Sequence, residues 1–343
     1  MRETTERIEG VPEEASLVYE AIRVSIVVPV YQGESTLADL IKEIEPLTHG
    51  QRTPGGKVLR VTEVILVNDG AVDGSSEVMK LLAAQWDFVS SIWLSRNFGQ
   101  HPATLAGMAC STGEWVVTMD EDGQHDPAYL AFMLDQAETS GAQLVYARPV
   151  NSPPHAWWRN ASSHVVNRLA RWLVGNPQKG DFSSFRLVRG DIARSLAAYC
   201  GQGVFLDVAL AWVVGLVAFC PVHLRMERGR PSGYSMQRLI SHFWRLLLTA
   251  GTRPLRVITV LGSVSILAAL GISGYAIWAK LAHHIPIQGW TSLITAICLF
   301  SGLILFSLGV IAEYLSMTLT LAMGKPLYLI VPRQEARRDK SAQ

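Results

Sequence analysis

The sequence predicts an α/β domain built on a doubly wound, mostly parallel sheet, followed by an interfacial helix and two C-terminal transmembrane helices. Three observations lead to this fold class: short apolar runs alternate with helical segments, polar residues follow the runs, and long uncharged stretches lie near the C-terminus. The 343 residues are 49% hydrophobic and 17% charged, with a mean hydropathy of +0.22, which indicates that part of the chain lies in lipid. A net charge of +1 argues against a disordered chain and against a nucleic-acid partner.

Short runs rich in Val, Ile and Leu predict the strands of this sheet, and the segments between them have the length of helices. The runs are nearly continuous rather than alternating, which is typical of parallel strands that are buried on both faces. In such sheets ligands bind beyond the carboxyl ends of the strands, so the residues after each run are candidates for the functional site. The expected strands are 24–30, 63–67, 91–94, 115–119 and 143–147, and the expected helices are 35–47, 75–85, 100–110 and 127–140.

Polar, turn-forming residues follow several of these runs. Asp120 and Asp122 share one tight turn, where their mutual repulsion is readily explained by a divalent cation between them, and a solvated acidic turn is the alternative. Asp73 has an alternative role as the N-cap of the next helix, and Tyr31 as a packing residue at a strand end. The chain has no GxGxxG after the first strand and no GxxxxGK[ST], so neither a dinucleotide fold nor a P-loop is supported. If the chain binds a nucleotide without these motifs and uses a metal ion to neutralise the diphosphate, it belongs with the enzymes that use nucleotide sugars.

Two uncharged stretches, 257–279 and 285–312, predict a transmembrane hairpin. The first would be about 35 Å long as a helix, which is enough to cross a hydrocarbon core of about 30 Å. The alternative is a pair of buried helices in a soluble protein. The connecting loop has Lys280 as its only Lys or Arg, whereas basic residues flank the hairpin, so we expect both termini to be cytoplasmic. The flanking residues are Arg238, Arg245, Arg253, Arg256, Lys325, Arg333, Arg337, Arg338 and Lys340.

The remaining segments complete the expected organisation. Residues 236–253 mix Arg with Leu, Phe and Trp, as an interfacial helix does, although an ordinary amphipathic helix packed on the soluble domain fits equally well. The first twenty residues contain no apolar run, so we expect no secretory signal peptide. The four cysteines form no CxxC pair and no zinc-like cluster, which excludes a disulfide scaffold and a structural zinc site. The expected units are an extension (1–20), the α/β domain (21–235), the interfacial helix (236–253), the hairpin (254–322) and a basic tail (323–343).

Several motifs follow one another along the chain: PVY at 29–31, NDGxxDGS at 68–75, LSRNFGQHPATLAGM at 94–108 and DEDGQH at 120–125, then HAWWR at 155–159, NRL at 167–169, GDF at 180–182 and EY at 313–314. The first four resemble the GT-A catalytic domain of family 2 glycosyltransferases. With two spans after them, the chain resembles the polyprenyl-phosphate glycosyltransferases, the group that includes undecaprenyl-phosphate 4-deoxy-4-formamido-L-arabinose transferase and dolichyl-phosphate mannose synthase. The resemblance covers about residues 23–330.

The chain departs from the usual pattern of this group at a few positions. Gln32 and Gly33 stand where Asn-Glu is usual, with Glu34 displaced by one, and Glu121 replaces a small residue. Ala71 stands in place of Ser, and Gly233 in place of Lys. We expect the chemistry to survive these departures, whereas the sugar need not be the arabinose derivative.

The resemblance implies an inverting transfer of a sugar from a nucleotide donor, expected to be UDP-linked, to undecaprenyl or another polyprenyl phosphate. The product would be a lipid-linked monophosphosugar for envelope glycan or lipid A modification. Because the acceptor phosphate is already an anion, its oxygen can attack without a dedicated general base. By resemblance, Mg²⁺ or Mn²⁺ is bound by Asp120, Asp122 and Gln124, the nucleotide by Pro29, Tyr31, Glu34, Asp69, Asp120 and Arg228, and the catalytic and acceptor-phosphate residues are Asp122, Arg148, Arg159 and Ser163.

Some of these assignments have simpler alternatives. Arg suits a bidentate contact with phosphate, but Arg159 also fits as a surface residue beside Trp157 and Trp158, and Arg228 as a loop charge. A catalytically silent, membrane-anchored binding module is a second function, against which the intact Asp69, Asp120, Asp122 and Gln124 argue. A processive polysaccharide synthase should carry more spans and a QxxRW motif. The resemblance further implies the inner membrane of a bacterium, a cytoplasmic catalytic domain and a tetramer.

Overall fold

A mixed sheet with β1 (Ile22–Val30) near its middle organises the part of the chain that the computed structural model describes, which is residues 21–151, 182–201, 204–225 and 289–332 with isolated positions between 262 and 278. The other strands are β2 (Gln51–Arg52), β3 (Val58–Asn68), β4 (Val89–Leu94), β5 (Trp115–Thr118), β6 (Leu144–Pro149), β7 (Arg186–Arg189), β8 (Val217–Val222) and β9 (Ile330–Val331). Their order is β8-β6-β7-β5-β1-β3-β4-β9, and β2 pairs with β3. The pairs β1–β3, β1–β5, β3–β4 and β6–β8 are parallel, whereas β7 is antiparallel to both of its neighbours.

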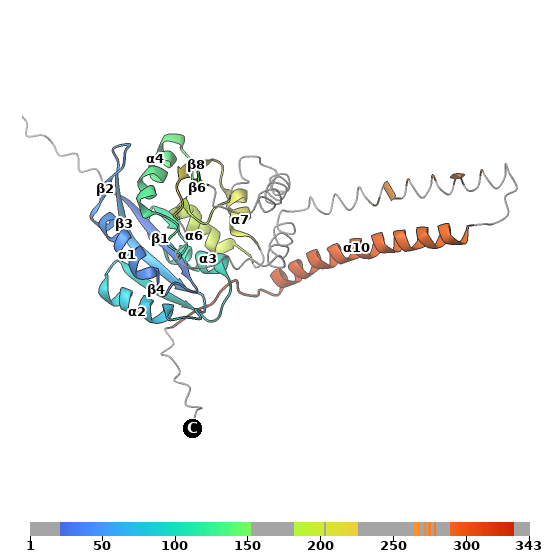
Figure 1. Ribbon diagram of the computed structural model, residues 1–343, viewed down its shortest axis with the longest axis horizontal. Coiled ribbons are helices and arrows are strands. Elements are labelled where there is room, and N and C mark those ends of the chain that lie inside the picture. Colours follow the sequence, from blue (N-terminus) through green and yellow to red (C-terminus); the bar gives the residue numbers. More distant parts are fainter. Residues whose placement is uncertain are drawn as a thin grey trace, which may run out of the picture.

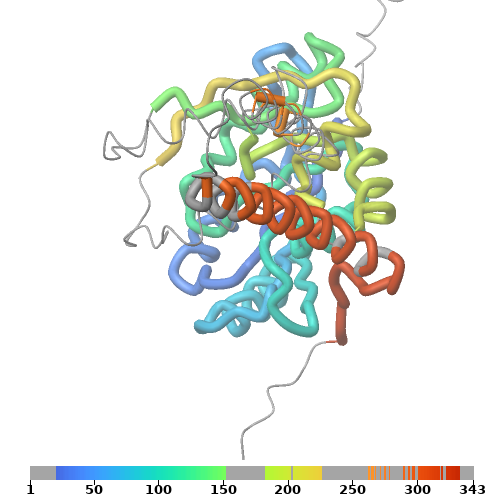
Figure 2. The backbone as a smooth tube through the Cα atoms, turned by 90° about the vertical axis from the view of Figure 1, so that its right-hand side faces the viewer, coloured from blue at the N-terminus to red at the C-terminus, as the bar shows by residue number. Residues whose placement is uncertain are grey.

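Helices cover both faces of the sheet and make a three-layered domain (Figures 1 and 2). The helices are α1 (Leu37–Ile44), α2 (Ser75–Gln85), α3 (Gln100–Cys110), α4 (Leu130–Ser140), α6 (Gly190–Tyr199), α7 (Leu206–Val213) and α10 (Trp290–Ala322), with short 3-10 turns at Glu45–His49 and Pro127–Tyr129. Side chains of α1, α2 and α4 belong to one core cluster, and those of α3, α6 and α7 to the other.

The burial pattern of β1 explains why its sequence is a continuous apolar run. Val24, Ile26 and Val28 belong to the core cluster with α1, α2 and α4, whereas Val27 belongs to the cluster on the opposite face. A strand covered on both faces needs apolar residues at successive positions because neighbouring side chains point to opposite sides.

The elements expected from the sequence between residues 24 and 147 are present. The expected strands fall within or overlap β1, β3, β4, β5 and β6, and the expected helices overlap α1, α2, α3 and α4. The sheet is mostly parallel, as predicted, but the antiparallel β7 between β5 and β6 was not expected. Its four residues, RLVR, are too short and too charged at their ends to give a clear periodic signal.

The long helix α10 extends away from the α/β domain, and the chain after it returns to the sheet (Figure 1). There β9 pairs with β4 and forms the edge of the sheet, and the N–H of Ser95 donates to the carbonyl of Leu329 at 2.9 Å. Among the described residues, we find no helix that has both the length and the apolar character for crossing a membrane. Most of the first expected span, the whole interfacial helix and the N-terminal extension lie outside the described residues.

Gly107 allows α3 to pack closely on the central strands. A Cβ at this position would overlap Cγ1 of Val27 and lie 3.0 Å from Cγ2 of Val67. Both valines are almost completely buried and belong to β1 and β3, so neither can move aside easily.

We therefore expect Gly107→Ala to destabilise the protein by about 1 to 2 kcal/mol, because overpacking outweighs the gain in helix propensity of about 1 kcal/mol. Urea unfolding of the purified chain, followed by tryptophan fluorescence, measures this. Gly215→Ala is the matched control, since its nearest neighbour would be Oε1 of Gln143 at 3.9 Å. Equal unfolding midpoints for the two variants would contradict this explanation of the packing.

Candidate active site

The loop that follows β1 is tied to the loop that follows β5 by the carboxylate of Glu121. The backbone N–H groups of Tyr31 and Gln32 donate to this carboxylate at 2.9 and 2.8 Å. The hydroxyl of Thr36 donates to the backbone carbonyl of Glu121 at 2.5 Å. Glu121, which stands where the resembled group has a small residue, therefore bridges two loops at the carboxyl edge of the sheet.

Gly33 lies directly against this bridge. A Cβ at position 33 would be 2.7 Å from Oε2 of Glu121 and 2.9 Å from Cγ of Leu37. The N–H of Gly33 donates to the hydroxyl of Ser75 at 2.8 Å, which fixes the glycine in place. The two departures at 33 and 121 are thus physically coupled, because the carboxylate from one loop fills the room that a side chain on the other would need.

Asp69, at the end of β3, holds the loop that follows β4. Its two carboxylate oxygens accept the N–H groups of Phe98 at 2.7 Å and Gly99 at 2.9 Å, and the residue is 3% exposed. Burial raises the pKa of Asp69, against the opposing effect of these hydrogen bonds and of Arg96. A carboxylate oxygen can accept a second hydrogen bond, so the role of Asp69 toward a nucleotide base stays a prediction.

The turn before α2 accounts for two further acidic residues. The carboxylate of Asp73 accepts the N–H and the hydroxyl of Ser75, the first residue of α2, but the N-cap of this helix is Gly74 rather than Asp73 as the alternative expected. Burial acts to raise the pKa of Asp73, but the hydrogen bonds that its carboxylate accepts, from Ser75 and from the N–H of Glu34 among others, together outweigh burial and lower the pKa. The predicted nucleotide ligand Glu34 accepts the N–H of Gly74 at 3.0 Å, so its carboxylate also lies against this turn.

Two side chains from distant parts of the chain orient the carboxylate of Asp120. Nε2 of Gln100 donates to Oδ1, and the hydroxyl of Ser184 donates to Oδ2, both at 2.5 Å. The N–H of Asp120 donates to Nδ1 of His125 at 3.0 Å, and this imidazole stacks on Phe185 with ring centroids 4.9 Å apart.

Sequence reasoning gave no role to these partners of Asp120. Gln100 lies in RNFGQH, His125 lies in DEDGQH, and Ser184 closely follows GDF. Their position in or beside these motifs was the feature of the sequence that could have identified them as residues of the site.

Asp122 and Gln124 share the tight turn that begins at Asp120. The N–H of Gln124 donates to Oδ1 of Asp122 at 3.0 Å, and Gly123 between them has a φ of 73°. No group of three His, Cys, Asp or Glu side chains within the described ranges is arranged to hold a metal ion. Two carboxylates on one turn nevertheless fit Mg²⁺ or Mn²⁺, because Mg²⁺ in phosphoryl sites is held by one or two carboxylates together with phosphates of the substrate.

The structure brings Arg148 to the same edge of the sheet. Thr118, the last residue of β5, and Tyr146 of β6 both pair with Arg186 of β7, so β6 continues from the level at which β5 ends to Pro149. Arg148 is exposed there, and its guanidinium lies 5.0 Å from the ring centroid of Phe219.

The other predicted site residues divide into those at this edge and those not described. Pro29 lies near the end of β1, and the side chain of Tyr31 after it is 40% exposed. Tyr31, Asp69, Asp120, Asp122, Gln124 and Arg148 thus meet at one edge of the sheet. Arg159, Ser163 and Arg228 lie outside the described residues.

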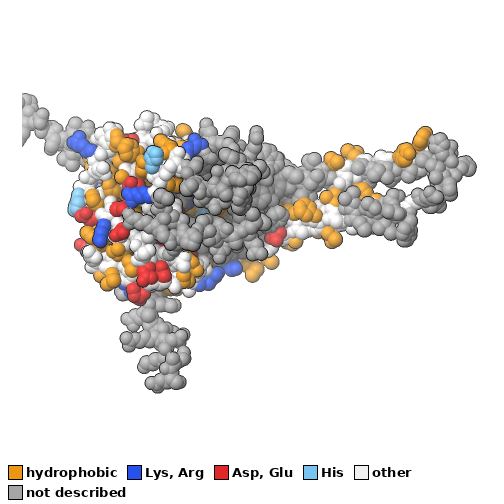
Figure 3. Space-filling model, viewed as in Figure 1, with side chains coloured by type: hydrophobic (Ala, Val, Ile, Leu, Met, Phe, Trp, Pro, Cys, Tyr) orange, Lys and Arg blue, Asp and Glu red, His pale blue; other side chains and the backbone are white. Residues whose placement is uncertain are grey.

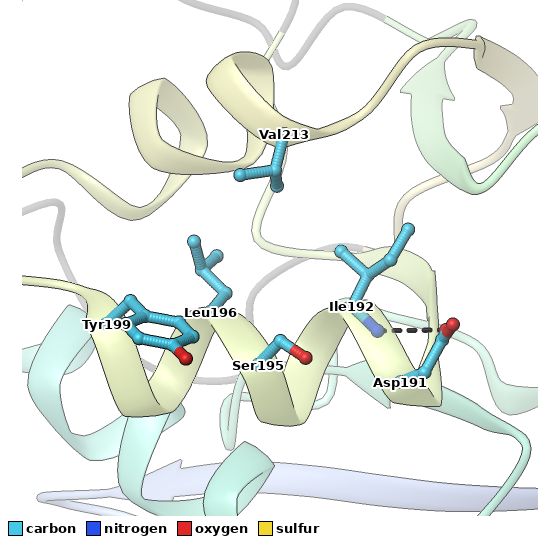
Figure 4. A pocket seen from close by; sticks show the side chains of 6 residues that line it. All are labelled: Asp191, Ile192, Ser195, Leu196, Tyr199 and Val213. Carbon is cyan, nitrogen blue, oxygen red and sulfur yellow. Dashed lines mark hydrogen bonds between the residues drawn. The ribbon is translucent and has the colours of Figure 1, made fainter.

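A pocket of about 160 Å³ between α6 and α7 is separate from this edge (Figure 4). The helix α6 begins directly after Arg189, and Arg189 pairs with Trp115 at the start of β5. The pocket therefore lies near the end of the strands that is opposite the candidate site. None of the predicted site residues line it. Its lining residues are Asp191, Ile192, Ser195, Leu196, Tyr199 and Val213.

The contact between Gly33 and Glu121 gives a double-mutant prediction. Gly33→Ala should destabilise the protein by about 1 to 2 kcal/mol, and by about 1 kcal/mol less in a Glu121→Ala background, because the carboxylate that it meets is then gone. Urea unfolding of the wild type, both single variants and the double variant measures this coupling. Pairing Gly33→Ala with Glu34→Ala is the control, since that carboxylate lies on Gly74. Additive effects in the Glu121 cycle would refute the coupling.

Comparison with known proteins gives separate matches for the α/β domain and for the C-terminal hairpin. Residues 25–196 match the family Glycosyl transferase family 2, and residues 253–318 match the GtrB C-terminal hairpin. The chain is similar to glucosyl-3-phosphoglycerate synthase from Mycobacterium tuberculosis in complex with Mn²⁺, UDP and glucosyl-3-phosphoglycerate, at 20% identity over 66% of this chain and 78% of that one, with a TM-score of 0.47. It is also similar to S. aureus TarS 1–349 in complex with UDP-GlcNAc, at 14% identity over 67% of each chain, with a TM-score of 0.44. The match over residues 25–196, half of the chain, shows that this protein belongs to glycosyl transferase family 2.

Proposed function

We propose that the protein transfers a sugar from a UDP-linked donor to a polyprenyl phosphate, with inversion at the anomeric carbon. The observation that carries the proposal is the turn at Asp120 and Asp122, where Gln100 and Ser184 fix the orientation of one carboxylate at the carboxyl edge of the sheet. Ligands of α/β sheets bind at this edge, and a diphosphate needs a cation beside such carboxylates.

The donor side is assigned from the chain's own residues. The exposed ring of Tyr31 and the carboxylate of Asp69 would bind the base, and Asp120, Asp122 and Gln124 would hold Mg²⁺ or Mn²⁺. An ion held by these residues would supply the positive charge that offsets the negative charge of the diphosphate and of the leaving nucleotide. Because Asp120 is oriented before any ligand arrives, little rearrangement is needed at that residue.

The acceptor side is assigned to cationic residues. Arg148 is exposed at the same edge, and Arg159 and Ser163 complete the set by resemblance. A guanidinium can bind two phosphate oxygens at once and thereby direct the third toward the anomeric carbon. A polyprenyl phosphate is ionised at neutral pH, so this set needs no general base.

The proposal includes the membrane, because its acceptor is a lipid. Its supports are the uncharged stretches 257–279 and 285–312 and the match of residues 253–318 to the GtrB C-terminal hairpin. Apolar side chains line the projecting helix α10 (Figure 3), and Leu305, Leu308 and Leu315 are 69%, 54% and 66% exposed. We propose the inner membrane of a bacterium, with the catalytic domain and both termini cytoplasmic and the chain assembled as a tetramer.

A transfer assay with the purified full chain tests this function. We expect one nucleotide sugar from a panel to give a lipid-linked product with a short polyprenyl phosphate and Mn²⁺. Asp122→Asn should lower transfer by about 10²-fold, equivalent to about 3 kcal/mol of transition-state stabilisation, while leaving the fold intact. Asp87→Asn, on an exposed turn after α2, controls for the loss of one carboxylate. Full activity of Asp122→Asn, or of the wild type in excess chelator, would overturn the metal role.

A second variant separates the acceptor from the donor. Arg159→Ala should raise the KM for polyprenyl phosphate and lower turnover, together by about 2 kcal/mol for a lost charge-assisted contact, while nucleotide affinity stays nearly unchanged. Arg159→Lys should recover part of the loss, because an ammonium supplies charge without the planar fork. If Arg159 only anchors the neighbouring tryptophans, acceptor kinetics in detergent will match the wild type.

A further inference from the structure

A buried ion pair lies beneath the candidate active site. Nη1 of Arg186, on β7, is bonded to Oδ1 of Asp207 in the first turn of α7, and the two residues are 3% and 4% exposed. The hydroxyl of Tyr146, on β6, donates to the same oxygen at 2.9 Å. Burial and the charge of Asp207 raise the pKa of Tyr146, so this phenol stays a proton donor.

The ion pair is connected to Asp120 by further hydrogen bonds. Nε of Arg186 donates to Oγ1 of Thr118 at 3.1 Å, and the hydroxyl of Thr118 donates to the carbonyl of Ser184 at 2.5 Å. The hydroxyl of Ser184 in turn donates to Oδ2 of Asp120 at 2.5 Å. A continuous chain of contacts therefore runs from α7 through β7 and β5 to this carboxylate, and Tyr146 of β6 joins it at Asp207.

Stability alone is a weak reason for such a pair. Removing two charges from water costs several kcal/mol per ion, and well-packed apolar residues of similar size often give an equally stable or more stable protein. A fully hydrogen-bonded buried network does, however, fix the relative positions of the elements that it joins. Here those elements are the strands that carry Thr118, Tyr146 and Arg186 up to the site.

We propose that Arg186, Asp207 and Tyr146 form a positioning cluster that sets the orientation of the Asp120 carboxylate through Thr118 and Ser184. The cluster touches neither donor nor acceptor and acts through these two residues. The inference rests on the proposed function, because it takes Asp120 as a ligand of the ion that accompanies the nucleotide. Partners one layer outside a metal ligand commonly change metal affinity 10- to 100-fold when they are removed.

The decisive variant is the apolar replacement Tyr146→Phe/Arg186→Met/Asp207→Leu, which leaves neither a lone buried charge nor an unpaired phenol. We expect it to unfold at the same or a higher urea concentration than the wild type, yet to bind Mn²⁺ several-fold more weakly in the presence of UDP. Electron paramagnetic resonance of free Mn²⁺ gives the affinity without requiring transfer activity. A folded variant whose affinity lies within twofold of the wild type would overturn the proposal.

The chain offers a matched control on the same strand. Arg189 and Asp191 form an exposed pair near the other end of β7, with side chains 47% and 57% exposed. Arg189→Gln/Asp191→Asn removes the same charges and should leave Mn²⁺ affinity unchanged. A loss of affinity in this control as large as in the triple variant would mean that removing any Arg–Asp pair from this part of the domain weakens Mn²⁺ binding, whatever its position.

Single substitutions carry the test if the triple variant does not fold. Ser184→Ala removes only the last hydroxyl, and Thr118→Val removes only the hydroxyl between Arg186 and Ser184. Each should weaken Mn²⁺ binding with UDP several-fold, and wild-type affinity in both would refute the connection. Failure of the proposed function looks different, because then the wild type itself would bind no Mn²⁺ with UDP.

Discussion

The parallel pairing of β1 with β3 and β5 is the constraint on which the candidate site depends. It brings the carboxyl ends of three strands to one edge, and each strand is followed there by a short polar loop. The pairing is stable because β1 is apolar on both faces and helices cover both of them.

The loops themselves are held by carboxylates that accept backbone N–H groups. Glu121 accepts from the loop after β1, Asp69 from the loop after β4, and Glu34 from the turn before α2. A carboxylate that accepts these hydrogen bonds fixes a loop, and it has fewer lone pairs left to bind a ligand. Asp120 differs, because its partners are the side chains of Gln100 and Ser184, which hold the carboxylate itself in position. Asp122 lies between these two cases, because Oδ1 of its carboxylate accepts the N–H of Gln124 at 3.0 Å within the same turn.

Local pattern was enough to predict much of the fold. The apolar runs of β1, β3 and β5 and the polar residues after them gave the strands and the edge at which Tyr31, Asp69 and Asp120 meet. It was not enough for β7, whose antiparallel direction depends on pairing with two strands far away in sequence. Nor could it give the pair Arg186–Asp207, because an isolated Arg and an isolated Asp have no local signature of mutual burial. The Gly33–Glu121 contact was visible only as two departures from one family pattern, and structure was needed to join them.

The central claim is that Asp120 and Asp122 hold a cation beside a nucleotide diphosphate. Anomalous diffraction from crystals of the full chain grown with UDP and MnCl₂ tests it most directly. The account predicts a Mn²⁺ peak within coordination distance of the Asp122 carboxylate and of Asp120, with the UDP phosphates on its other side. A Mn²⁺ peak away from this turn, or ordered UDP bound elsewhere in the domain, would contradict the account.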